Sequence, residues 1–432
     1  MKKLLQINIC SNVLSTGKIC EDIAKVAQST GWETYIAYNS NGRPSVSQEI
    51  RIGSKVNKYR HFIQNKLFDN EGLNSRKETL YLLDCIEKIR PDVVHLHNIH
   101  DHWLNYPMLF QYIAKHDLPV VWTQHDCWSF TGGCMYFDLS KCEKWKNGCS
   151  DCPERRGLLV RNRSERNFRL KKELLDSIPS VTFVPVSDWL NDLMKQSVQK
   201  NRPIVTIHNG IDISKFKPMP SDSRKKFNIL GVAAVWDARK GLQDFIRLRC
   251  MLPSEFGITL VGLTSKQIQS LPRGIEGICR TSSVEELVKL YSDADVFVNP
   301  TYSDNFPTTN LEALACGTSV ITYRTGGSPE AVDEQTGIVV EQGDIEGIVK
   351  AVLQMKRYPY SLASCRKRAE DYFDKDKCFD MYLTIYDNAL KGIIPCVSAV
   401  GCRGGVKCRY SISCIFDCNE SLFAAIYRRF VA

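Results

Sequence analysis

Short apolar runs alternate with longer amphipathic stretches through the first half of the chain. The amphipathic stretches predict helices, among them residues 18–29 and a segment that ends before Pro91. Buried strands that alternate with helices indicate a doubly wound parallel α/β sheet, whose ligands bind outside the carboxyl ends of the strands. The predicted strands of this first sheet are residues 4–9, 34–38, 93–96, 120–123 and 182–185.

A second set of apolar runs begins after a turn at Asn209-Gly210. Its predicted strands are residues 230–235, 258–261, 295–299 and 319–323, and its predicted helices are residues 284–292, 344–356 and 360–373. Residues 204–207 form an apolar run at the boundary. We therefore predict two Rossmann-like domains, residues 1–203 and 204–376, then a helix over 377–391 and a cysteine-rich tail over 392–432 with no assigned role.

Length and composition limit the class of protein. The chain has 432 residues, of which 43% are hydrophobic, and it has no run of 18 apolar residues that would span a membrane. The start, MKKLLQINIC, is basic and then apolar, but polar residues interrupt it and no cleavage site follows. We expect a first strand rather than a signal peptide, and a cytoplasmic protein whose 18 cysteines form no disulfide framework.

Positive charge is concentrated in one segment of a chain with a net charge of +9. Two interpretations stay open: a solvated helix face, or attraction to anionic lipid or to a diphosphate-linked acceptor. A nucleic-acid partner is not expected, because no recognised binding module accompanies the charge. The segment contains eight basic residues against three acids: Arg155, Arg156, Arg161, Arg163, Arg166, Arg169, Lys171 and Lys172.

The most informative stretch runs from Asp295 to Ala331. It predicts a strand, a polar loop, a helix that opens at Pro307 and stops at Gly317, and a second strand. A loop that leads into a helix directs backbone N–H groups and the positive end of the helix dipole at one point, which suits a diphosphate. Two carboxylates, Asp304 and Glu312, flank that point and suit hydroxyl groups. A sugar nucleotide carries both kinds of group; its phosphates are expected beside Asn305, Phe306, Pro307, Thr308 and Thr309.

The two acids also carry a resemblance. Asp304-x7-Glu312, followed by ALACG, resembles the E-x7-E signature of retaining glycosyltransferases of family 4, which have the GT-B fold; Asp304 replaces the usual first Glu. Other motifs fall in the family's order over roughly residues 1–390, among them DVVHLHN, HDCW, HNGID and Arg239-Lys240-Gly241. The pattern HDCWSFTGGCMYF…CEKWKNGCSDCP is similar to the WcaC-like branch, glycosyltransferases of colanic acid and exopolysaccharide biosynthesis.

The resemblance implies an arrangement and roles. The two domains would face each other across a cleft, and a helix over 377–390 would cross back to the first domain. Glu312 would bind the ribose hydroxyls and Asp304 would lie near the donor sugar. His125 would face the donor from the first domain, and Lys240, with Arg239 beside it, would stabilise the leaving diphosphate.

Two further features lie in the first domain. Ser15, Thr16 and Gly17 are expected to form a small-residue loop where the backbone can approach the ligand. His95 and His97 are expected to point to opposite faces of a strand, so that one of them is structural. For the reaction, the family implies a front-face, retaining mechanism without a catalytic metal or other cofactor.

A cysteine cluster offers a separate hypothesis. Cys134, Cys142, Cys149 and Cys152 have the spacing C-x7-C-x6-C-x2-C and could ligate a structural zinc ion. Reduced, packed thiols are the alternative.

These observations favour a cytoplasmic glycosyltransferase, peripheral at the inner membrane face. It would move a sugar from a nucleotide-sugar donor to a lipid-linked or oligosaccharide acceptor during surface polysaccharide biosynthesis. The alternatives are a sugar-nucleotide epimerase of the same fold, and a non-catalytic glycan-binding protein.

Overall fold

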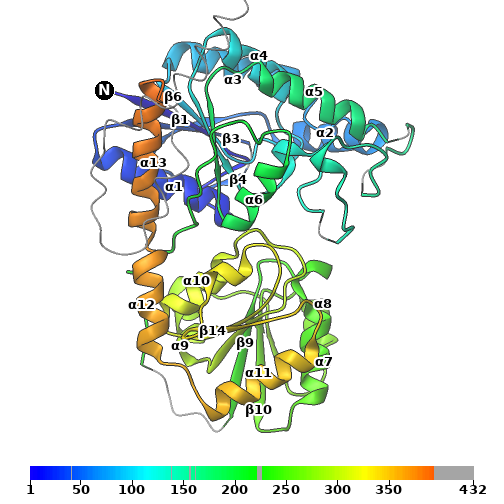
Figure 1. Ribbon diagram of the computed structural model, residues 1–432, viewed down its shortest axis with the longest axis vertical. Helices are drawn as coiled ribbons and strands as arrows, with labels where there is room; N and C mark the ends of the chain where they lie inside the picture. The colour runs from blue at the N-terminus through cyan, green and yellow to red at the C-terminus, as the bar shows by residue number, and fades with distance from the viewer. Residues whose placement is uncertain (40, 138, 155–156, 161, 221–225, 394–432) are drawn as a thin grey trace, which may run out of the picture. The chain divides into compact units, whose positions relative to one another are not determined.

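The computed structural model describes residues 1–393 except 40, 138, 155–156, 161 and 221–225 (Figure 1). The described residues belong to one compact unit. The predicted cysteine-rich tail lies, from residue 394 onward, outside the described residues. No helix in the described part of the chain is both long and apolar enough to cross a membrane.

The first sheet is fully parallel, with strand order β5-β3-β1-β6-β7-β8. Its strands are β1 (Lys3–Ile7), β3 (Glu33–Tyr38), β5 (Gln48–Arg51), β6 (Val93–Leu96), β7 (Val120–Gln124) and β8 (Val181–Pro185). Backbone hydrogen bonds of Val205 and Ile207 extend this sheet beside β8. The helices between its strands are α1 (Leu14–Ser29), α2 (Lys55–Phe68), α3 (Arg76–Ile89), α4 (Tyr106–Lys115), α5 (Ser164–Asp176) and α6 (Asp188–Gln196).

The second sheet is also parallel, with strand order β11-β10-β9-β12-β13-β14. Its strands are β9 (Phe227–Val232), β10 (Phe256–Val261), β11 (Ile275–Ile278), β12 (Val296–Asn299), β13 (Val320–Tyr323) and β14 (Gly337–Val340). Two parallel sheets, each with helices between its strands, confirm the predicted α/β class. The connecting helices are α7 (Leu242–Met251), α8 (Ser265–Gln269), α9 (Val284–Asp293) and α10 (Thr308–Ala315), and α11 (Ile345–Arg357) follows the last strand.

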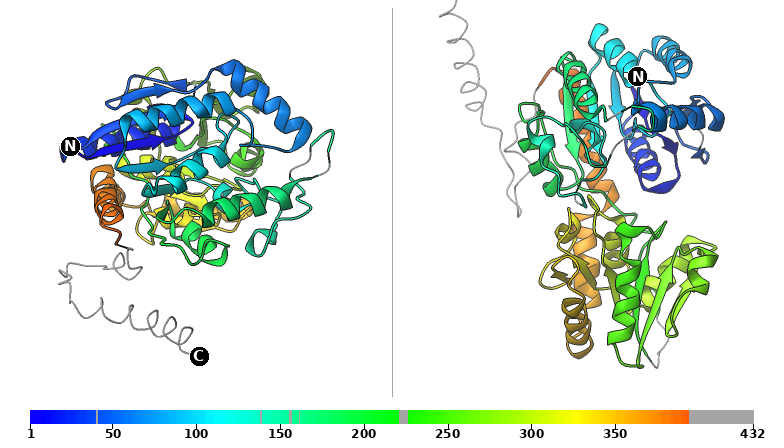
Figure 2. Two further views of the ribbon diagram at one scale, coloured as in Figure 1. Left: turned by 90° about the horizontal axis from the view of Figure 1, so that it is seen from above. Right: turned by 90° about the vertical axis from the view of Figure 1, so that its right-hand side faces the viewer.

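The last two helices pack on different sheets. In Figure 1, α12 (Leu362–Tyr372) lies beside α10 of the second sheet, while α13 (Lys375–Leu390) runs alongside α1 of the first, and Figure 2 shows the same arrangement from two other sides. Tyr382 and Tyr386 of α13 are buried. The chain therefore ends its described part against the first sheet, where it reaches polar groups of β6 and β7.

The start of α1 differs from the prediction. The helix begins at Leu14, so Ser15, Thr16 and Gly17 form its first turn rather than a loop before it. Val13, in extended backbone, precedes the helix, and Leu14 has a positive φ of 57°. Sequence reasoning placed the boundary later because small polar residues favour loops over helices.

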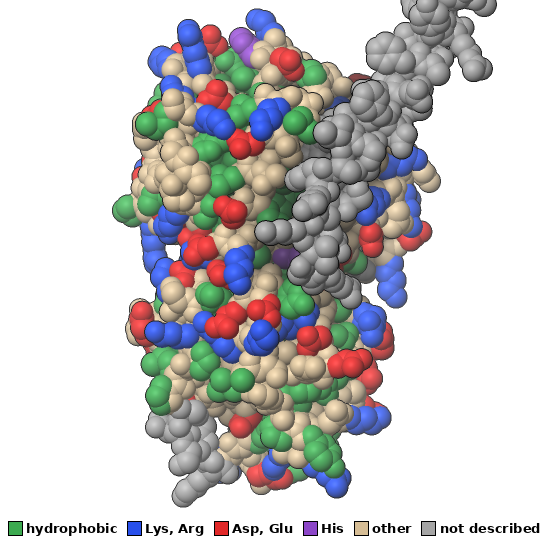
Figure 3. Space-filling model, turned by 60° about the vertical axis from the view of Figure 1, so that its left-hand side comes forward, with side chains coloured by type: hydrophobic (Ala, Val, Ile, Leu, Met, Phe, Trp, Pro, Cys, Tyr) green, Lys and Arg blue, Asp and Glu red, His purple; other side chains and the backbone are tan. Residues whose placement is uncertain are grey.

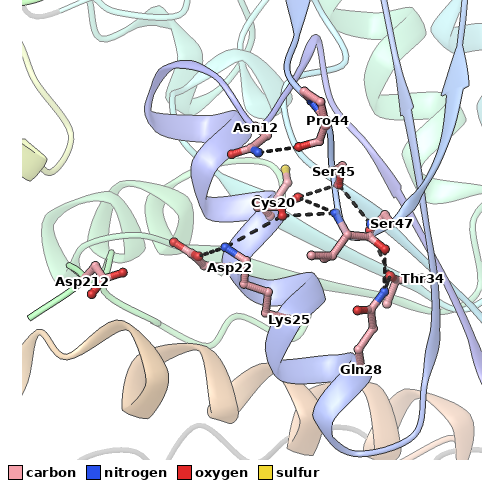
Figure 4. A network of polar contacts seen from close by, with 12 residues as sticks. Asn12, Cys20, Asp22, Lys25, Gln28, Thr34, Pro44, Ser45, Ser47 and Asp212 are labelled. Carbon is pink, nitrogen blue, oxygen red and sulfur yellow. Dashed lines mark hydrogen bonds and ion pairs between the residues drawn. The ribbon is translucent and has the colours of Figure 1, made fainter. Parts of the chain in front are cut away.

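A polar network fixes α1 against the loop between the short strand β4 (Asn41–Gly42) and β5 (Figure 4). The buried carboxylate of Glu21 accepts hydrogen bonds from the Ser45 hydroxyl at 2.5 Å and from the Val46 N–H at 3.2 Å. Asn12 donates to the carbonyl of Pro44 at 2.7 Å. These contacts hold both ends of the turn that carries Gly17.

Candidate active site

Two of the predicted residues meet at the carboxyl end of the second sheet. Lys240 ends a short 3-10 helix after β9, and Asp304 lies in the loop after β12. Lys240 Nζ and Asp304 Oδ2 lie 2.5 Å apart, with the two side chains 24% and 20% exposed. The half-buried ion pair lies outside the carboxyl ends of the strands, where ligands of parallel α/β sheets bind.

Backbone contacts place Lys240 against the loop that carries Asp304. Gly241 has φ +72°, and a Cβ there would lie 2.3 Å from the carbonyl oxygen of Pro300. The N–H of Tyr302 donates to the carbonyl of Arg239 at 2.7 Å. Only glycine allows this close approach at a positive φ, so the Arg-Lys-Gly motif has a structural reason for its third residue.

The side chain of Arg239 is held by two neighbours. Its guanidinium donates to Asp237 Oδ2 at 2.9 and 3.1 Å and stacks over the ring of Tyr136, with its central carbon 4.6 Å from the ring centroid. Tyr136 follows β7 of the first sheet and was not singled out by the sequence. The only signal for it was the pattern HDCWSFTGGCMYF. Arg239 thus links the two sheets, and its predicted contact with the donor stays a prediction.

The loop before α10 is tightly packed. Gly326 and Gly327 press on it: a Cβ at Gly326 would lie 1.8 Å from the Asp304 carbonyl oxygen, and one at Gly327 would lie 2.2 Å from that of Asn305. Pro307 does not open α10 as predicted; it precedes the first helical residue in extended backbone, with ψ 118°. Thr308 and Thr309 form the start of the helix and are half-buried.

Two other predicted residues of this loop have different environments. Phe306 is buried, and its ring centroid lies 4.9 Å from that of His208 and 5.7 Å from that of Phe373. The Asn305 side-chain amide donates to the backbone carbonyl of His125. Its other atom, Oδ1, is buried and has no hydrogen-bond partner among the described residues. Phe306 anchors the loop, while Asn305 joins it to the first sheet and offers an acceptor to a ligand.

Glu312 lies on α10, five residues into the helix. Its Oε2 accepts a hydrogen bond from the Tyr291 hydroxyl at 2.8 Å. Burial raises the pKa of Glu312 to about 7, and the charge of Lys18 on α1 partly opposes that rise. Lys18 is a residue that the sequence analysis missed; its signal was a cation directly after Gly17. Glu312 therefore lies at a point that groups of both sheets can reach.

The atoms that contact Gly17 belong to the first domain. A Cβ at this position would lie 3.0 Å from Cys10 Sγ and 3.1 Å from the backbone nitrogen of Asn12. A side chain there would push apart the turn and the strand end. The predicted role of Gly17 in donor binding stays a prediction.

Histidines gather at the carboxyl ends of β6 and β7. His95 and His97 do not point to opposite faces as predicted; their ring centroids are 4.0 Å apart. The prediction was wrong because residues two apart in an extended chain share a face. His95 contacts the Tyr386 hydroxyl through Nδ1 and the Thr123 hydroxyl through Nε2, each at 2.7 Å. It belongs to the packing of α13.

His125 lies beside His97, with His125 Nε2 and His97 Nδ1 at 3.1 Å. Burial lowers the pKa of His125 to about 4 and lowers that of His97 well below its usual range. Both rings are therefore neutral near pH 7. Asn305, in the loop after β12, contacts the backbone carbonyl of His125, and the predicted role of His125 at the donor stays a prediction.

A buried pair lies next to this histidine. His100 Nε2 and Asp126 Oδ2 are 2.7 Å apart, and Asp126 Oδ1 accepts from the Trp128 N–H at 2.9 Å. Burial works against a charged His100, but the charge and hydrogen bond of Asp126 prevail and raise the pKa of His100. This pair fixes the turn after β7 and thereby the backbone of His125.

The side chain of Lys171 also binds to the turn after β7. It is buried, donates to the carbonyls of Trp128 at 2.5 Å and Thr131 at 3.0 Å, and lies 3.4 Å from the Trp128 ring centroid. Lys171 therefore does not contribute to the exposed positive charge predicted for its segment. In the same segment Arg169 pairs with Glu165 and Lys172 with Asp176, and Arg155, Arg156 and Arg161 lie outside the described residues.

The four cysteines of the predicted zinc site do not assemble. Cys134 Sγ and Cys152 Sγ are 3.5 Å apart, and Cys149 Sγ accepts the Gly132 N–H at 3.1 Å. In the part of the chain that the structure describes, no three metal-ligating atoms of these cysteines lie within 4.8 Å of one another. A tetrahedral thiolate site needs all four sulfur atoms about 4 Å apart. The donor set does not fit zinc.

A pocket that the sequence does not predict lies at the carboxyl ends of β9 and β10. Its volume is about 360 Å³. Trp236 forms one wall of the pocket. Its Nε1 donates to the carbonyl of Val261 at 2.8 Å, and Gln267 Nε2 donates to the backbone carbonyl of Trp236 at 2.9 Å. The pocket is lined by Ala234, Val235, Trp236, Gly262, Thr264, Lys266, Gln267 and Ser270.

Two family models match most of the chain. The model described as "Glycosyltransferase Family 4" matches residues 17–215, and the one described as "Glycosyl transferases group 1" matches residues 226–357. The two matches fall on the first and second sheets respectively, and each contains site residues described above.

Relatives agree with these matches. The chain is 22% identical over 413 residues to WcaC of Escherichia coli K12, whose name places it in colanic acid biosynthesis; the match covers 89% of this chain and 99% of WcaC. It is 25% identical over 234 residues to an N,N'-diacetylbacillosaminyl-diphospho-undecaprenol alpha-1,3-N-acetylgalactosaminyltransferase of Campylobacter jejuni, over 49% of this chain and 61% of that protein.

Solved structures share the fold. HepE of Anabaena, in a crystal structure in complex with UDP, superposes with a TM-score of 0.63 at 14% identity, over 90% of this chain and 100% of that one. Two parallel sheets in this arrangement form the GT-B fold. The chain therefore belongs to the family 4 glycosyltransferases.

Proposed function

We propose that this glycosyltransferase transfers a sugar with retention from a nucleoside diphosphate to a glycan acceptor. One observation carries the proposal: Lys240, Asp304, the loop before α10 and His125 converge at facing strand ends. Lys240 is the cation for the leaving diphosphate, whose negative charge increases in the transition state. It must first leave Asp304, so donor binding exchanges one anion for another.

The proposed reaction breaks the bond between the anomeric carbon and the phosphate oxygen. The acceptor oxygen attacks that carbon on the face from which the phosphate leaves, and the leaving phosphate takes the acceptor proton. Lys240 and the N–H groups at the start of α10 hold the phosphate, while Asp304, freed from Lys240, turns to the donor sugar's hydroxyls. This scheme uses no metal ion or other cofactor.

We place the nucleoside across α10 and the pocket beside Trp236. Glu312, as a carboxylate, accepts hydrogen bonds from both ribose hydroxyls. The pocket of about 360 Å³ lies at the same edge of the sheet and takes the base. Because HepE binds UDP with the same fold, UDP-sugars are the donors to test first.

The acceptor is proposed to be a glycan linked to a lipid diphosphate, made into a surface polysaccharide. The relatives support this: one is named for colanic acid biosynthesis and another for an undecaprenol-linked substrate. A screen of nucleotide sugars by thermal shift, followed by product analysis with a lipid-diphosphate acceptor, tests the assignment. A new glycosidic bond is the expected result. Donor hydrolysis or epimerisation without a transfer product would overturn it.

We further propose that α2 faces the inner leaflet of the membrane. Four large apolar side chains of this helix are 38–68% exposed: Val56, Tyr59, Phe62 and Ile63. The neighbouring Leu158 and Leu159 are 79% and 67% exposed, and their N–H groups donate to the carbonyls of Lys66 and Leu67 at the end of α2. Lys55, Arg60 and Lys66 are exposed on the same helix.

Apolar side chains beside lysine and arginine are the pattern of an interfacial helix. By contrast, the face in Figure 3 shows basic and acidic side chains interspersed, with no separate positive area. Each cation near an anionic surface contributes about 1 kcal/mol, and the apolar side chains add their burial in the headgroup region. We therefore assign the membrane contact to α2 rather than to the α5 segment, where Lys171 is buried.

Vesicle sedimentation separates these two surfaces. Substitution of Lys55, Arg60 and Lys66 by Gln, or of Tyr59 and Ile63 by Ser, should weaken binding to phosphatidylglycerol vesicles at least tenfold. Substitution of Arg163, Arg166 and Arg169 by Gln should have a smaller effect. The same charge change at Lys350, Lys356 and Arg357 of α11 is the control. If the α5 variant loses binding and the α2 variants keep it, the assignment to α2 is wrong.

A further inference from the structure

A row of three side chains leads from the interior of the first sheet to its candidate catalytic residue. Gln6 lies on β1, His97 directly after β6, and His125 directly after β7. Gln6 and His97 are buried, and His125 is half-buried. His97 Nε2 lies 3.1 Å from Gln6 Oε1, and His97 Nδ1 lies 3.1 Å from His125 Nε2. The row is continuous, and each member has a defined neighbour.

The orientation of the Gln6 amide sets the direction of every hydrogen bond in the row. Gln6 Nε2 donates to the carbonyl of Cys20 on α1 at 2.8 Å. The amide oxygen therefore faces His97, and it can only accept. His97 Nε2 must carry a proton. A neutral imidazole has one N–H, so His97 Nδ1 holds a lone pair and accepts from His125.

The same argument then applies to His125. Its Nε2 must carry the proton that it donates to His97, and a neutral ring then leaves Nδ1 with a lone pair. Both rings are neutral near pH 7, because burial lowers the pKa of each. His125 Nδ1 makes no hydrogen bond to any residue that the structure describes. One ring nitrogen of a half-buried side chain is thus left as an acceptor for a ligand.

We propose that Gln6 and His97 are positioning residues that hold His125 in the Nε2–H tautomer, so that His125 Nδ1 accepts a hydrogen bond from a substrate hydroxyl. This inference rests on the proposed function, which places His125 at the donor. It also narrows that role. A lone pair attracts a sugar or acceptor O–H group and repels a phosphate oxygen, so His125 recognises the glycosyl part of the donor or the acceptor, and not the diphosphate.

His95 supports the row without belonging to it. Its ring packs at 4.0 Å from that of His97, but its two nitrogens contact Tyr386 and Thr123. The charged pair His100 and Asp126 acts on the His125 ring with opposite signs: Asp126 raises the pKa of His125 and His100 lowers it. Neither group is in the row, so the tautomer is set by Gln6.

The tautomer is directly measurable. In nitrogen-15 correlation spectra of the full chain labelled at its histidine rings, protonated and unprotonated ring nitrogens resonate far apart. His97→Gln and His125→Gln variants assign the two sets of signals by their loss. At pH 7 we expect the proton of both rings on Nε2. A His125 ring with its proton on Nδ1, or one that averages between the two forms, would overturn the inference.

Gln6→Met tests the cause, because methionine keeps the length and replaces the amide oxygen by a thioether sulfur, which is only a weak acceptor. The expected result is a His125 ring that averages between tautomers, and a kcat reduced on the order of tenfold, the value of one lost hydrogen bond. UDP affinity should not change. Gln199→Met is the matched control: Gln199 is buried in the same domain, and neither polar atom of its side chain has a hydrogen-bond partner among the described residues. It should leave spectrum and kcat unchanged.

The outcomes separate the row from the enzyme assignment. If Gln6→Met leaves the His125 tautomer unchanged, Gln6 does not set it and the inference fails, whatever the kinetics. If the tautomer changes while kcat is unaffected, the row exists but does not act on the substrate, and this also overturns the inference. If no variant of Lys240 or His125 affects glycosyl transfer, the proposed function fails, and the spectra still decide the tautomer.

Discussion

The two sides of the candidate site are stabilised in different ways. On the first sheet, neutral side chains are buried and joined by hydrogen bonds from Gln6 through His97 to His125. On the second sheet, the central contact is an ion pair between Lys240 and Asp304 that is about one-fifth exposed. The first side is arranged by the fold before any ligand arrives. On the second side the two charges compensate each other, and the proposed function has a diphosphate replace Asp304 at the lysine.

This difference separates effects on folding from effects on function. Removing one partner from a buried hydrogen bond leaves the other unsatisfied and costs about 1–3 kcal/mol. A partly exposed ion pair contributes about 0–1 kcal/mol. Substitutions of Lys240 or Asp304 should therefore change the activity and leave stability almost unaltered, while substitutions of Gln6 or His97 should change both.

The largest effect is expected for Lys240→Met. It removes the cation at the leaving diphosphate, which should lower kcat about a hundred- to a thousandfold, with little change in the melting temperature. The control is Lys356→Met, which removes an exposed lysine that pairs with Glu255 on the same domain. Steady-state kinetics and thermal unfolding measure the two effects. Activity within a few-fold of the wild type would remove Lys240 from the site.

Asp304→Asn should separate binding from turnover. Loss of the carboxylate frees Lys240 and removes a negative charge that competes with the diphosphate. UDP should bind a few-fold more tightly, while kcat falls about tenfold, because a charged hydrogen bond to the donor sugar becomes a neutral one. Calorimetry with UDP and product formation measure the two quantities. If UDP binds more weakly to the variant, Asp304 is not a competitor for Lys240.

Several features of this comparison were readable from the sequence and others were not. The parallel sheets follow from apolar runs, and Asp304, Glu312 and the loop before α10 follow from one spaced motif. Lys240 is indicated only because Arg239-Lys240-Gly241 resembles a motif of the family. The hydrogen-bond row does not, because Gln6 sits in an apolar strand where a single polar residue has no pattern. Contacts such as Arg239 with Tyr136 join distant segments, and no local rule predicts them.

The errors have local causes as well. Opposite faces for His95 and His97 are wrong because side chains of a strand alternate with a period of two, so residues two apart share a face. The cysteine spacing predicts a zinc site, but spacing does not fix the direction of each Cβ–S bond, and no three of the four sulfur atoms lie within 4.8 Å of one another in the described part of the chain. The charge of Lys171 predicts an exposed position, but its ammonium group is buried because it donates to the carbonyls of Trp128 and Thr131.

Glu312, on the second side of the site, is a buried carboxyl group rather than a partly exposed ion pair, and burial raises its pKa to about 7. Its folded-state pKa lies above the unfolded value, so its contribution to stability is present below about pH 4.5 and is lost as pH rises through 7. Glu312→Gln should thus unfold at a higher temperature than the wild type at pH 8, but not at pH 4.5.

The same carboxylate should make ligand affinity depend on pH. Uridine, which lacks a titrating phosphate, should bind the wild type a few-fold more tightly at pH 8 than at pH 6, because only the ionised form accepts from both ribose hydroxyls. Glu312→Gln should remove this dependence and weaken binding. Equal pH profiles for the two proteins would contradict the ribose role.

The smallest effect on activity is expected on the side arranged by the fold. Tyr386→Phe removes the hydroxyl that contacts His95 Nδ1 and leaves a fully buried nitrogen without its partner. Stability should fall by about 1–3 kcal/mol. Because His95 packs beside the row but donates nothing to it, kcat should change less than twofold and the His125 tautomer should not change.

Tyr372→Phe on α12 is the control, since Tyr372 is 61% exposed and its loss should leave stability unaltered. Chemical denaturation and the histidine spectra decide the result. A large fall in kcat together with a changed His125 tautomer would show that α13, through Tyr386 and His95, also determines which nitrogen of His125 is the acceptor. The positioning network would then extend from the site to the last described helix of the chain.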